Sequence, residues 1–355
     1  MSIYKLLQAS WRASASTLSA VTLVVMAIFL SLTAGPGKSQ TLSPPPIPTA
    51  GAYIGAWVNP LDLKDQNLPG SVEIMQLPTF VSHIGKTPSI LHIFLPGLSW
   101  ASTNSGAGGP LQQVLNQIVE NGAVPMIDLP CDVSMDDIAN GDTTIRSEFI
   151  TLANNLATWP HPIFLRWDWE MNNAPNPKCT DGMNPAKFVP AWQNIWKWFH
   201  PSPPASIAPN VAFVWCPSAA GGGPNGVRDD FYPGDRYVDW IGGDAFDRSD
   251  ETPNFFSTDF QNLYDHYYTG YITAGKTPKP ILVGATGATP QYQSQFILAI
   301  QQTLPTDFPG IKAVIYFDAP GNVPGPDTSL SLTGSGFGAF TSLVDSSVFY
   351  RDPNP

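Results

Sequence analysis

The residues of this chain with the clearest chemical potential are carboxylic acids and tryptophans that follow short apolar runs. The run Pro162–Trp167 leads directly into Asp168, Trp169 and Glu170. Acids can protonate and displace a glycosidic oxygen, and flat indole faces stack on sugar rings. The residues that close or follow the apolar runs are Trp57, Asn59, Trp100, Asp128, Asp168, Glu170, Asn172, Trp215, Ser218, Asp244, Asp247, Ala285, Thr286 and Asp318.

Glu170 is the strongest candidate for a catalytic group. Strand alternation in PIFLRWDWEMNNA predicts Arg166, Asp168 and Glu170 on one face. Neighbouring indoles, those of Trp167, Trp169 and Trp215, would raise the pKa of a carboxyl toward that of a general acid. The alternative to catalysis is a structural ion pair between Arg166 and one carboxylate, and we expect this structural role for Arg166 and Asp168. The residues expected to contact a sugar are Trp57, Trp100, Arg166, Trp169, Asn172, Trp215 and Asp244.

Eight apolar runs must position these residues, and each has the length and composition of a strand buried on both faces. The runs are Ala52–Val58, Ser89–Leu95, Ala123–Leu129, Pro162–Trp167, Val211–Cys216, Tyr237–Asp244, Pro280–Gly284 and Lys312–Phe317. Amphipathic segments between them predict helices at Pro110–Gly122, Thr143–Trp159, Asn184–His200 and Thr289–Leu304. Eight strand–helix units predict a (β/α)₈ barrel, whose chemistry lies at the carboxyl ends of the strands.

Composition excludes several other functions. With 17 Lys and Arg against 28 Asp and Glu, the net charge is −11, which disfavours nucleic acid as a partner. None of the 5 histidines forms a His-x-His pair at a strand end, and no lysine closes a strand. Metal-dependent hydrolysis and Schiff-base chemistry are therefore not expected. The acidic loops lack the ligand spacing of a known calcium loop, so we expect no metal and no cofactor.

The chain divides into a leader, a linker and one folded domain. Lys5 and Arg12 precede an apolar run at 18–32, the layout of a secretory signal in residues 1–34. This indicates a secreted or periplasmic protein. An uncleaved membrane anchor formed by residues 18–32 is the alternative. A Pro-rich linker spans 35–50, and the catalytic-type domain spans 51–355.

Three cysteines leave at least one thiol unpaired. Cys131 and Cys179 follow neighbouring predicted strands and could pair on one rim of the barrel. Cys216 ends an apolar run and suits a buried thiol. The sequence leaves the connectivity open.

Five segments in order resemble family 26 of the glycoside hydrolases: RWDWEMN, KFVPAWQNIW, NVAFVWCPS, YPGDRYVDWIGGDAF and KPILVGATG. The resemblance covers most of residues 51–318. It implies an eight-fold barrel, a retaining mechanism with two glutamates, and a polysaccharide substrate such as β-mannan. It places Glu170 as the acid/base, with Asn172 as the polar residue that follows it. We expect the protein to act as a monomer.

Two positions depart from the family pattern. Trp169 stands where the family has histidine, and Ala285 stands at the position of the nucleophilic glutamate. Either another carboxylate serves, with Asp244, Asp318 or Asp168 as candidates, or the chain is a carbohydrate-binding pseudoenzyme. An engineered Glu-to-Ala substitution and a non-carbohydrate interaction role are further alternatives.

Overall fold

The computed structural model describes residues 42–58, 77–173, 179–223, 225–247, 258–319, 331–352 and 355. At its centre, eight parallel strands form a closed barrel, because β10 pairs with β1 as well as with β9. The barrel strands are β1 (Ala52–Val58), β2 (Ile90–Phe94), β3 (Val124–Leu129), β4 (Ile163–Trp167), β5 (Val211–Trp215), β8 (Trp240–Asp247), β9 (Ile281–Ala288) and β10 (Ile311–Asp318). The predicted (β/α)₈ barrel is confirmed, and each predicted run overlaps one of its strands.

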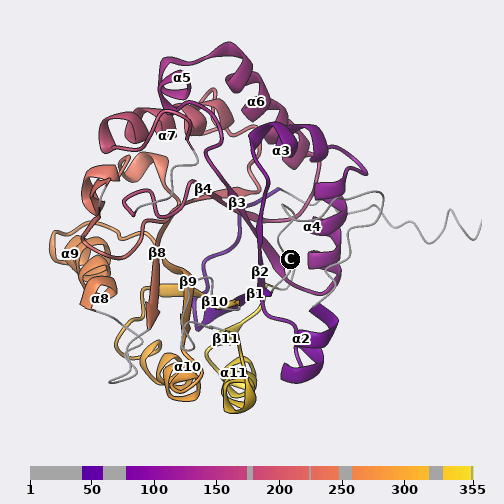
Figure 1. The fold of residues 1–355 in the computed structure, drawn as a ribbon, viewed down its shortest axis with the longest axis vertical. Coiled ribbons are helices and arrows are strands. Elements are labelled where there is room, and N and C mark those ends of the chain that lie inside the picture. The colour runs from indigo at the N-terminus through magenta and orange to yellow at the C-terminus, as the bar shows by residue number, and fades with distance from the viewer. Residues whose placement is uncertain are drawn as a thin grey trace, which may run out of the picture. The chain divides into compact units, whose positions relative to one another are not determined.

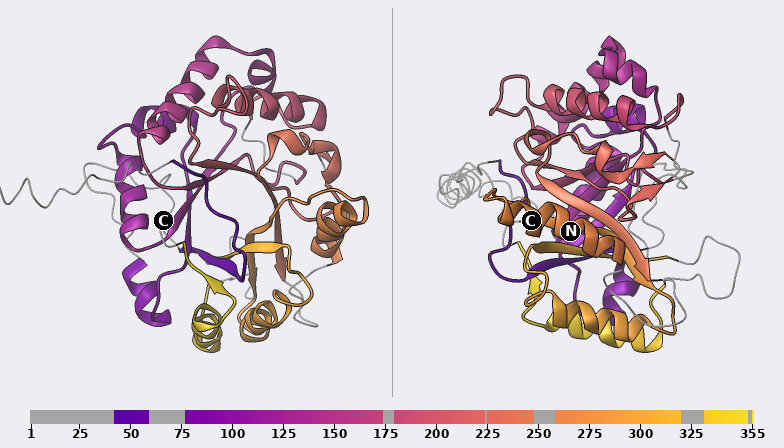
Figure 2. Two further views of the ribbon diagram at one scale, coloured as in Figure 1. Left: turned by 180° about the vertical axis from the view of Figure 1, so that it is seen from behind. Right: turned by 90° about the vertical axis from the view of Figure 1, so that its left-hand side faces the viewer.

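Helices surround the ring of strands (Figures 1 and 2). They are α2 (Leu77–Ile84), α3 (Leu98–Asn104), α4 (Pro110–Glu120), α5 (Met135–Asn140), α6 (Thr143–Ala157), α7 (Pro185–Phe199), α8 (Thr258–Tyr264), α9 (Gly270–Thr273), α10 (Gln293–Thr303) and α11 (Gly334–Asp345). Short turns are η2 (Arg228–Phe231), η3 (Asp235–Tyr237) and the π-turn η4 (Asp265–Thr269). The antiparallel pair β6 (Gly222–Gly223) and β7 (Gly226–Val227) follows β5, and β11 (Phe349–Tyr350) extends the sheet beside β1.

Helix α4 illustrates how the sequence forms these elements. Pro110 occupies its first turn, where the missing N–H costs nothing. Its apolar residues Leu111, Val114, Leu115 and Ile118 recur at helical spacing, and all four are buried. Gly122 follows the helix with a φ of 76°, a left-handed conformation that glycine adopts without strain. All four helices predicted from periodicity are present.

The barrel interior is filled in three levels. The lowest is apolar, with residues such as Tyr53, Val124 and Phe164 in one buried cluster. The middle level is polar and ionic. The upper level, at the carboxyl ends of the strands, is aromatic. Because every second residue of a strand faces inward, these levels follow the interior phase of each strand, for example Ile90, His92 and Phe94 of β2.

A register irregularity in β9 shapes the upper level. Val283 pairs with Gly243 and Ala285 pairs with Asp244, so Gly284 is skipped in the ladder with β8. The ladder with β10 also shifts, from Val283 opposite Val314 to Thr286 opposite Tyr316. A bulge of this kind re-aims side chains, and here it brings Ala285 level with Asp244.

The predicted leader lies outside the described residues, as does the linker up to residue 41. Within the part of the linker that is described, Pro46 accepts a hydrogen bond from the hydroxyl of Tyr53 (3.0 Å). Among the described segments, none of the helices has the length and apolarity needed to cross a lipid bilayer. The predicted signal or anchor therefore remains a prediction.

Candidate active site

The middle level of the barrel is a buried ionic cluster centred on Arg166. Its Nε donates to Asp128 Oδ1 (2.7 Å), and its Nη1 donates to both carboxylate oxygens of Asp244 (2.7 and 2.8 Å). Nη2 also donates to Asp128. His92 Nε2 lies 2.7 Å from Asp128 Oδ2, and Cys216 Sγ lies 3.1 Å from Asp244 Oδ1. One guanidinium thus bridges β3, β4 and β8, and Arg166 forms the expected structural ion pair with a carboxylate, that of Asp128, beside its contact with Asp244.

Burial and mutual charge set the ionisation of this cluster. Burial favours the neutral form of Asp128, but Arg166 and His92 outweigh it and lower the pKa of Asp128. Burial raises the pKa of Asp244 to about 8, with Arg166 opposing the shift and the charge of Glu170 adding to it. Burial also lowers the pKa of His92 and raises that of the Cys216 thiol, so both stay neutral near pH 7. Glu170 is therefore close enough to Asp244 for their charges to interact.

Glu170 lies just beyond β4, in a short segment that we call the acid loop (Asp168–Asn173). The strand ends at Trp167, and both Asp168 and Glu170 have positive φ values of 47° and 55°. A non-glycine residue in this conformation costs about 1–2 kcal/mol, and such strain clusters at functional sites. Asp168 and Glu170 therefore lie beyond the end of the strand. Strand alternation does not set their direction, so the reason for predicting that they share one face with Arg166 is lost.

Aromatic rings from five strand ends form the upper level. Trp57 stacks on Phe317 with centroids 4.5 Å apart and an interplanar angle of 15°. The ring centroid of Phe94 lies 6.0 Å from that of Trp57 and 4.9 Å from that of Trp169. The ring centroids of Phe246 and Phe317 are 6.0 Å apart. Trp57 is 6% exposed, whereas the other four rings are half-buried. The mouth of the barrel thus presents flat apolar faces beside Glu170.

Arg166 links the ionic and aromatic levels, because its guanidinium lies 5.6 Å from the ring of Trp169. The buried indole N–H of Trp57 has no hydrogen-bond partner within the described residues. Trp100, also predicted to contact a sugar, lies half-buried in α3. Asn59 lies outside the described residues, as does the side chain of Asp247.

The structure corrects the expectation for Trp215. Its side chain is fully buried, its Nε1 donates to the carbonyl of Phe231 (3.1 Å), and its ring packs against Tyr232 and Tyr267. Ala212 and Val214 belong to the barrel interior, so Trp215 has the opposite phase and points toward the helices. Trp167 has the same orientation and stacks on Phe188 of α7. Neither indole can form the cleft wall.

Asn172 and Arg166 are likewise inaccessible to a sugar. Asn172 is fully buried; its amide group donates to the carbonyls of Ser218 (3.1 Å) and Ala220 (3.0 Å), and its oxygen accepts from the N–H of Ser218 (2.9 Å). Arg166 is also fully buried. Both were expected to bind substrate, and both instead hold other parts of the site.

The three candidates for a second carboxylate differ in position. Asp318 has the outward phase of Val314 and Tyr316 and accepts from the N–H of Leu332 (2.7 Å), so it faces the helix layer. Burial raises the pKa of Asp318 to about 6. The carboxylate of Asp168 lies within 4.8 Å of the sulfurs of Cys131 and Cys179. Asp244 is 3% exposed and faces the interior beside Ala285, which makes it the candidate nearest to the expected nucleophile position.

Ala285 lies at the inner edge of the mouth. A Cβ on the adjacent Gly284 would fall 2.5 Å from Arg166 Nη1, 2.6 Å from Asp244 Oδ1 and 2.6 Å from Cys216 Sγ. Only glycine fits there, and the next residue, Ala285, is paired in register with Asp244 of the ionic cluster. Ala285 itself is 4% exposed and supplies only a methyl group.

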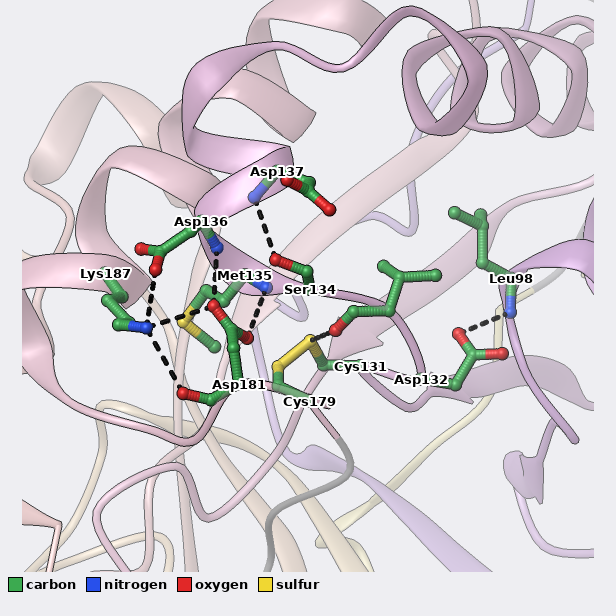
Figure 3. The surroundings of a disulfide bond; sticks show 11 residues. Leu98, Cys131, Asp132, Ser134, Met135, Asp136, Asp137, Cys179, Asp181 and Lys187 are labelled. Atoms are coloured by element: carbon green, nitrogen blue, oxygen red, sulfur yellow. Dashed lines mark hydrogen bonds and ion pairs between the residues drawn. A yellow bond between two sulfur atoms is a disulfide. The ribbon is translucent and has the colours of Figure 1, made fainter.

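A disulfide joins Cys131 and Cys179 (Figure 3), so the pairing considered from the sequence is present. Both sulfurs lie close to Asp168 of the acid loop, and Cys216 is a buried free thiol. Near the disulfide, the Asp181 carboxylate accepts from the N–H groups of Met135 (2.7 Å) and Asp136 (3.0 Å). The two cysteines and Asp168 form a cluster of potential ligand atoms, but disulfide sulfurs are not thiolates and cannot bind a metal ion.

Phe94, Phe246 and Phe317 are absent from the residues singled out in the sequence, although they complete the aromatic mouth. Each lies near the end of a strand and has the interior phase, because it follows His92, Asp244 or Ile315 by two residues. That combination is the signal that identifies them. His92 is missed because a single buried histidine carries no spacing pattern.

This fold is shared with solved family 26 enzymes. The catalytic domain of a family 26 endo-β-1,4-mannanase from Bacillus sp. JAMB-750 matches with a TM-score of 0.55 at 14% identity, over 85% of this chain and 87% of that one. Bacillus subtilis mannanase man26 matches with a TM-score of 0.53 at 17% sequence identity, over 86% of this chain and 88% of that one. The family 26 domain of an endo-β-mannanase/endo-β-glucanase from Prevotella bryantii matches with a TM-score of 0.54 at 14% sequence identity, over 85% of this chain and 91% of that one. The fold that the resemblance implies is therefore confirmed, and the chain is family 26-like in fold.

Sequence comparison adds one relative of lower coverage. The chain is 25% identical over 192 residues to the β-1,3-xylanase TXYA from Vibrio sp.. That stretch is 51% of this chain and 38% of the xylanase, so the chain spans well under half of that protein. No protein-family model matches the chain.

Proposed function

We propose that this chain is an exported glycoside hydrolase that acts on β-mannan or a related neutral, β-linked polysaccharide, with Glu170 as the general acid. The observation that carries the proposal is the position of Glu170. It lies at the carboxyl end of β4, the functional end of a (β/α)₈ barrel, and its charge acts on Asp244. It directly follows Trp169, whose half-buried ring contacts that of Phe94. In this role Glu170 protonates the leaving glycosidic oxygen while the rings stack on the sugar.

The substrate class follows from the mouth and from the similar proteins. Its described surface is aromatic, and Arg166, the cation of the ionic level below it, is buried and already hydrogen-bonded to Asp128 and Asp244. Such a mouth suits neutral sugars better than acidic ones. Family 26 mannanases share the fold, and the curated relative is a β-1,3-xylanase, so mannan and β-1,3-xylan are the first substrates to test. The apolar run at 18–32 supports export, and we expect the enzyme to work as a single chain.

A carbohydrate-binding protein without turnover is the second candidate, and Ala285 is the observation that favours it. In another hydrolase, loss of the nucleophile lowers turnover by about 10⁶-fold. Asp244 faces the same mouth, but both of its oxygens accept from Arg166, which limits its freedom to attack a sugar carbon or activate a water.

Reducing-sugar release separates these candidates. The substrates are β-1,4-mannan, β-1,3-xylan, β-1,4-xylan and a β-glucan, and the proteins are the parent, Glu170→Gln and Ala285→Glu. We expect Ala285→Glu to increase turnover steeply and Glu170→Gln to abolish it with the fold retained. If Glu170→Gln hydrolyses a glycan at the parental rate, Glu170 is not the acid. If neither the parent nor Ala285→Glu cleaves any glycan but calorimetry detects binding, the chain is a binder.

A further inference from the structure

The acid loop is held from the side of β5 by residues 216–223 and 225–227, which include the β6–β7 pair and which we call the clamp. The first contact is at the acid itself, because the N–H of Glu170 donates to the carbonyl of Cys216 (2.9 Å). Since Asp168 and Glu170 both have positive φ, the loop must be over-determined by surrounding contacts to keep this conformation. The clamp supplies those contacts.

Two asparagines connect the acid loop and the clamp in opposite directions. Asn172, on the loop, exchanges three hydrogen bonds with Ser218 and Ala220 of the clamp, at 2.9–3.1 Å. Asn225, on the clamp, donates from one Nδ2 to the carbonyls of Met171 (3.1 Å) and Asn173 (3.1 Å). The carbonyls of Met171 and Asn173, one on each side of Asn172, are therefore both held by the side chain of Asn225.

The clamp also approaches the loop more closely than any side chain would allow. A Cβ on Gly223 would lie 2.0 Å from the carbonyl oxygen of Asn172, so only glycine permits this contact. The hairpin is braced in turn by Arg228, whose N–H donates to Gly221 O (3.1 Å) and whose Nη1 donates to Ala219 O (2.8 Å). These two hydrogen bonds hold the backbone of the clamp on the side that contacts the acid loop.

We propose that the clamp positions Glu170 for proton transfer, with Asn225 and Asn172 as its positioning residues. The proposal rests on the proposed function, because it treats Glu170 as the general acid. Neither asparagine touches a reacting atom; each acts by fixing the backbone that carries Glu170. A second chemical contact exists at Glu170 itself, where the Asn173 amide donates to its Oε2 (3.3 Å), and Asn173 is one of the residues that Asn225 holds.

The test compares Asn225→Ala with Asn194→Ala as a matched control. Asn194 also donates from one Nδ2 to two backbone carbonyls, those of Ile138 (3.1 Å) and Ala139 (2.8 Å), but it ties α7 to α5 away from the acid loop. Asn225→Asp keeps the shape of the side chain and removes both donors, so it should behave as Asn225→Ala does.

The first measurement is hydrogen–deuterium exchange, which does not depend on activity. We expect the amides of Glu170 and Asn173 to exchange roughly tenfold faster in Asn225→Ala and Asn225→Asp than in the parent, or about 1.4 kcal/mol of local stability. Asn194→Ala should leave them unchanged. If the Asn225 variants exchange at the parental rate at these amides, the clamp proposal is overturned.

The second measurement is kcat/KM in the parent and in Ala285→Glu, on mannohexaose and on a dinitrophenyl β-mannobioside, whose leaving group needs no proton. Positioned general acids contribute about 10²–10⁴-fold. We therefore expect Asn225→Ala to lower kcat/KM on mannohexaose by about tenfold or more while changing the activated substrate less than about threefold. An equal loss on both substrates refutes a positioning role. If no form hydrolyses either substrate, the hydrolase proposal fails, and the exchange result by itself decides whether the clamp holds the loop.

Discussion

Replacing Arg166 by Met tests the account of the ionic cluster, because this one side chain compensates the buried charge of Asp128 and also donates hydrogen bonds to Asp244. Its guanidinium contacts Asp128 and Asp244, and all three side chains are at most 1% exposed. Removing one partner of a buried ion pair costs about 3–5 kcal/mol, because the remaining charge is left uncompensated. Met matches much of the apolar length of Arg, so the cavity contribution is small. We expect a loss of about 3–5 kcal/mol from a total of about 5–15 kcal/mol.

The pH dependence distinguishes this electrostatic cost from simple loss of packing. Arg166 now holds the pKa of Asp128 below its ordinary value. Without Arg166, burial would raise that pKa above the value in the unfolded chain, so the folded variant would bind a proton that the unfolded variant releases. Stability gained from that proton is present at low pH and lost as the pH rises. The deficit should therefore be largest near pH 7 and shrink toward pH 4, by up to about 1.4 kcal/mol per pH unit.

Urea unfolding at about pH 4.5, 5.5 and 7, with the disulfide kept oxidised, measures this deficit. Lys86→Met is the control, because Lys86 pairs with Asp345 at 3.7 Å and the two side chains are 37% and 64% exposed. An exposed pair of this kind contributes about 0–1 kcal/mol, so the control should lose much less. If Arg166→Met costs less than about 1 kcal/mol, or the same amount at every pH, the cluster does not depend on Arg166 in the way described.

Three further predictions follow from the site. Burial raises the pKa of Asp244 to about 8 from an ordinary 3.8, so the folded parent holds a proton that the unfolded chain releases. The stability that this proton contributes is lost as the pH rises from about 4 to 8, and Asp244→Asn should remove this pH dependence of the unfolding free energy in urea. Parallel pH profiles of the parent and the variant would contradict it. Closure of a loop with a sequence separation of 48 predicts that removing Cys131 and Cys179 together costs about 4 kcal/mol in the same assay, and no change in midpoint would refute this. Phe94→Ala and Trp169→Ala should each weaken mannohexaose binding by about 1–3 kcal/mol in calorimetry, and unchanged affinity would exclude them from the sugar-contacting surface.

The sequence predicts much of the fold because the decisive signals are local. Strand β1 matches its apolar run residue for residue, and α4 shows both its buried stripe and the glycine that follows it. Eight such units in order leave few alternatives to a barrel. The same local logic selects Glu170, since an acid that directly follows a buried strand must lie at the carboxyl end of a barrel.

The direction of each side chain in a strand that is buried on both faces cannot be predicted from such local signals. In the run Val211–Trp215 every residue is buried, so hydrophobicity gives no phase, and closure of the barrel decides that Val214 faces inward and Trp215 outward. That decision removes Trp215 from the mouth. It equally brings Phe94 and Phe317 into the mouth.

Long-range pairing accounts for what the sequence could not predict. The bulge at Gly284 depends on how β9 meets β8 and β10, and the bridging role of Arg166 depends on carboxylates 38 and 78 residues away. Asn225 reaches the acid loop across more than 50 residues of chain. Local periodicity determined the barrel and the acid at its mouth; tertiary structure decided which side chains surround that acid, because those contacts form only when distant strands close the ring.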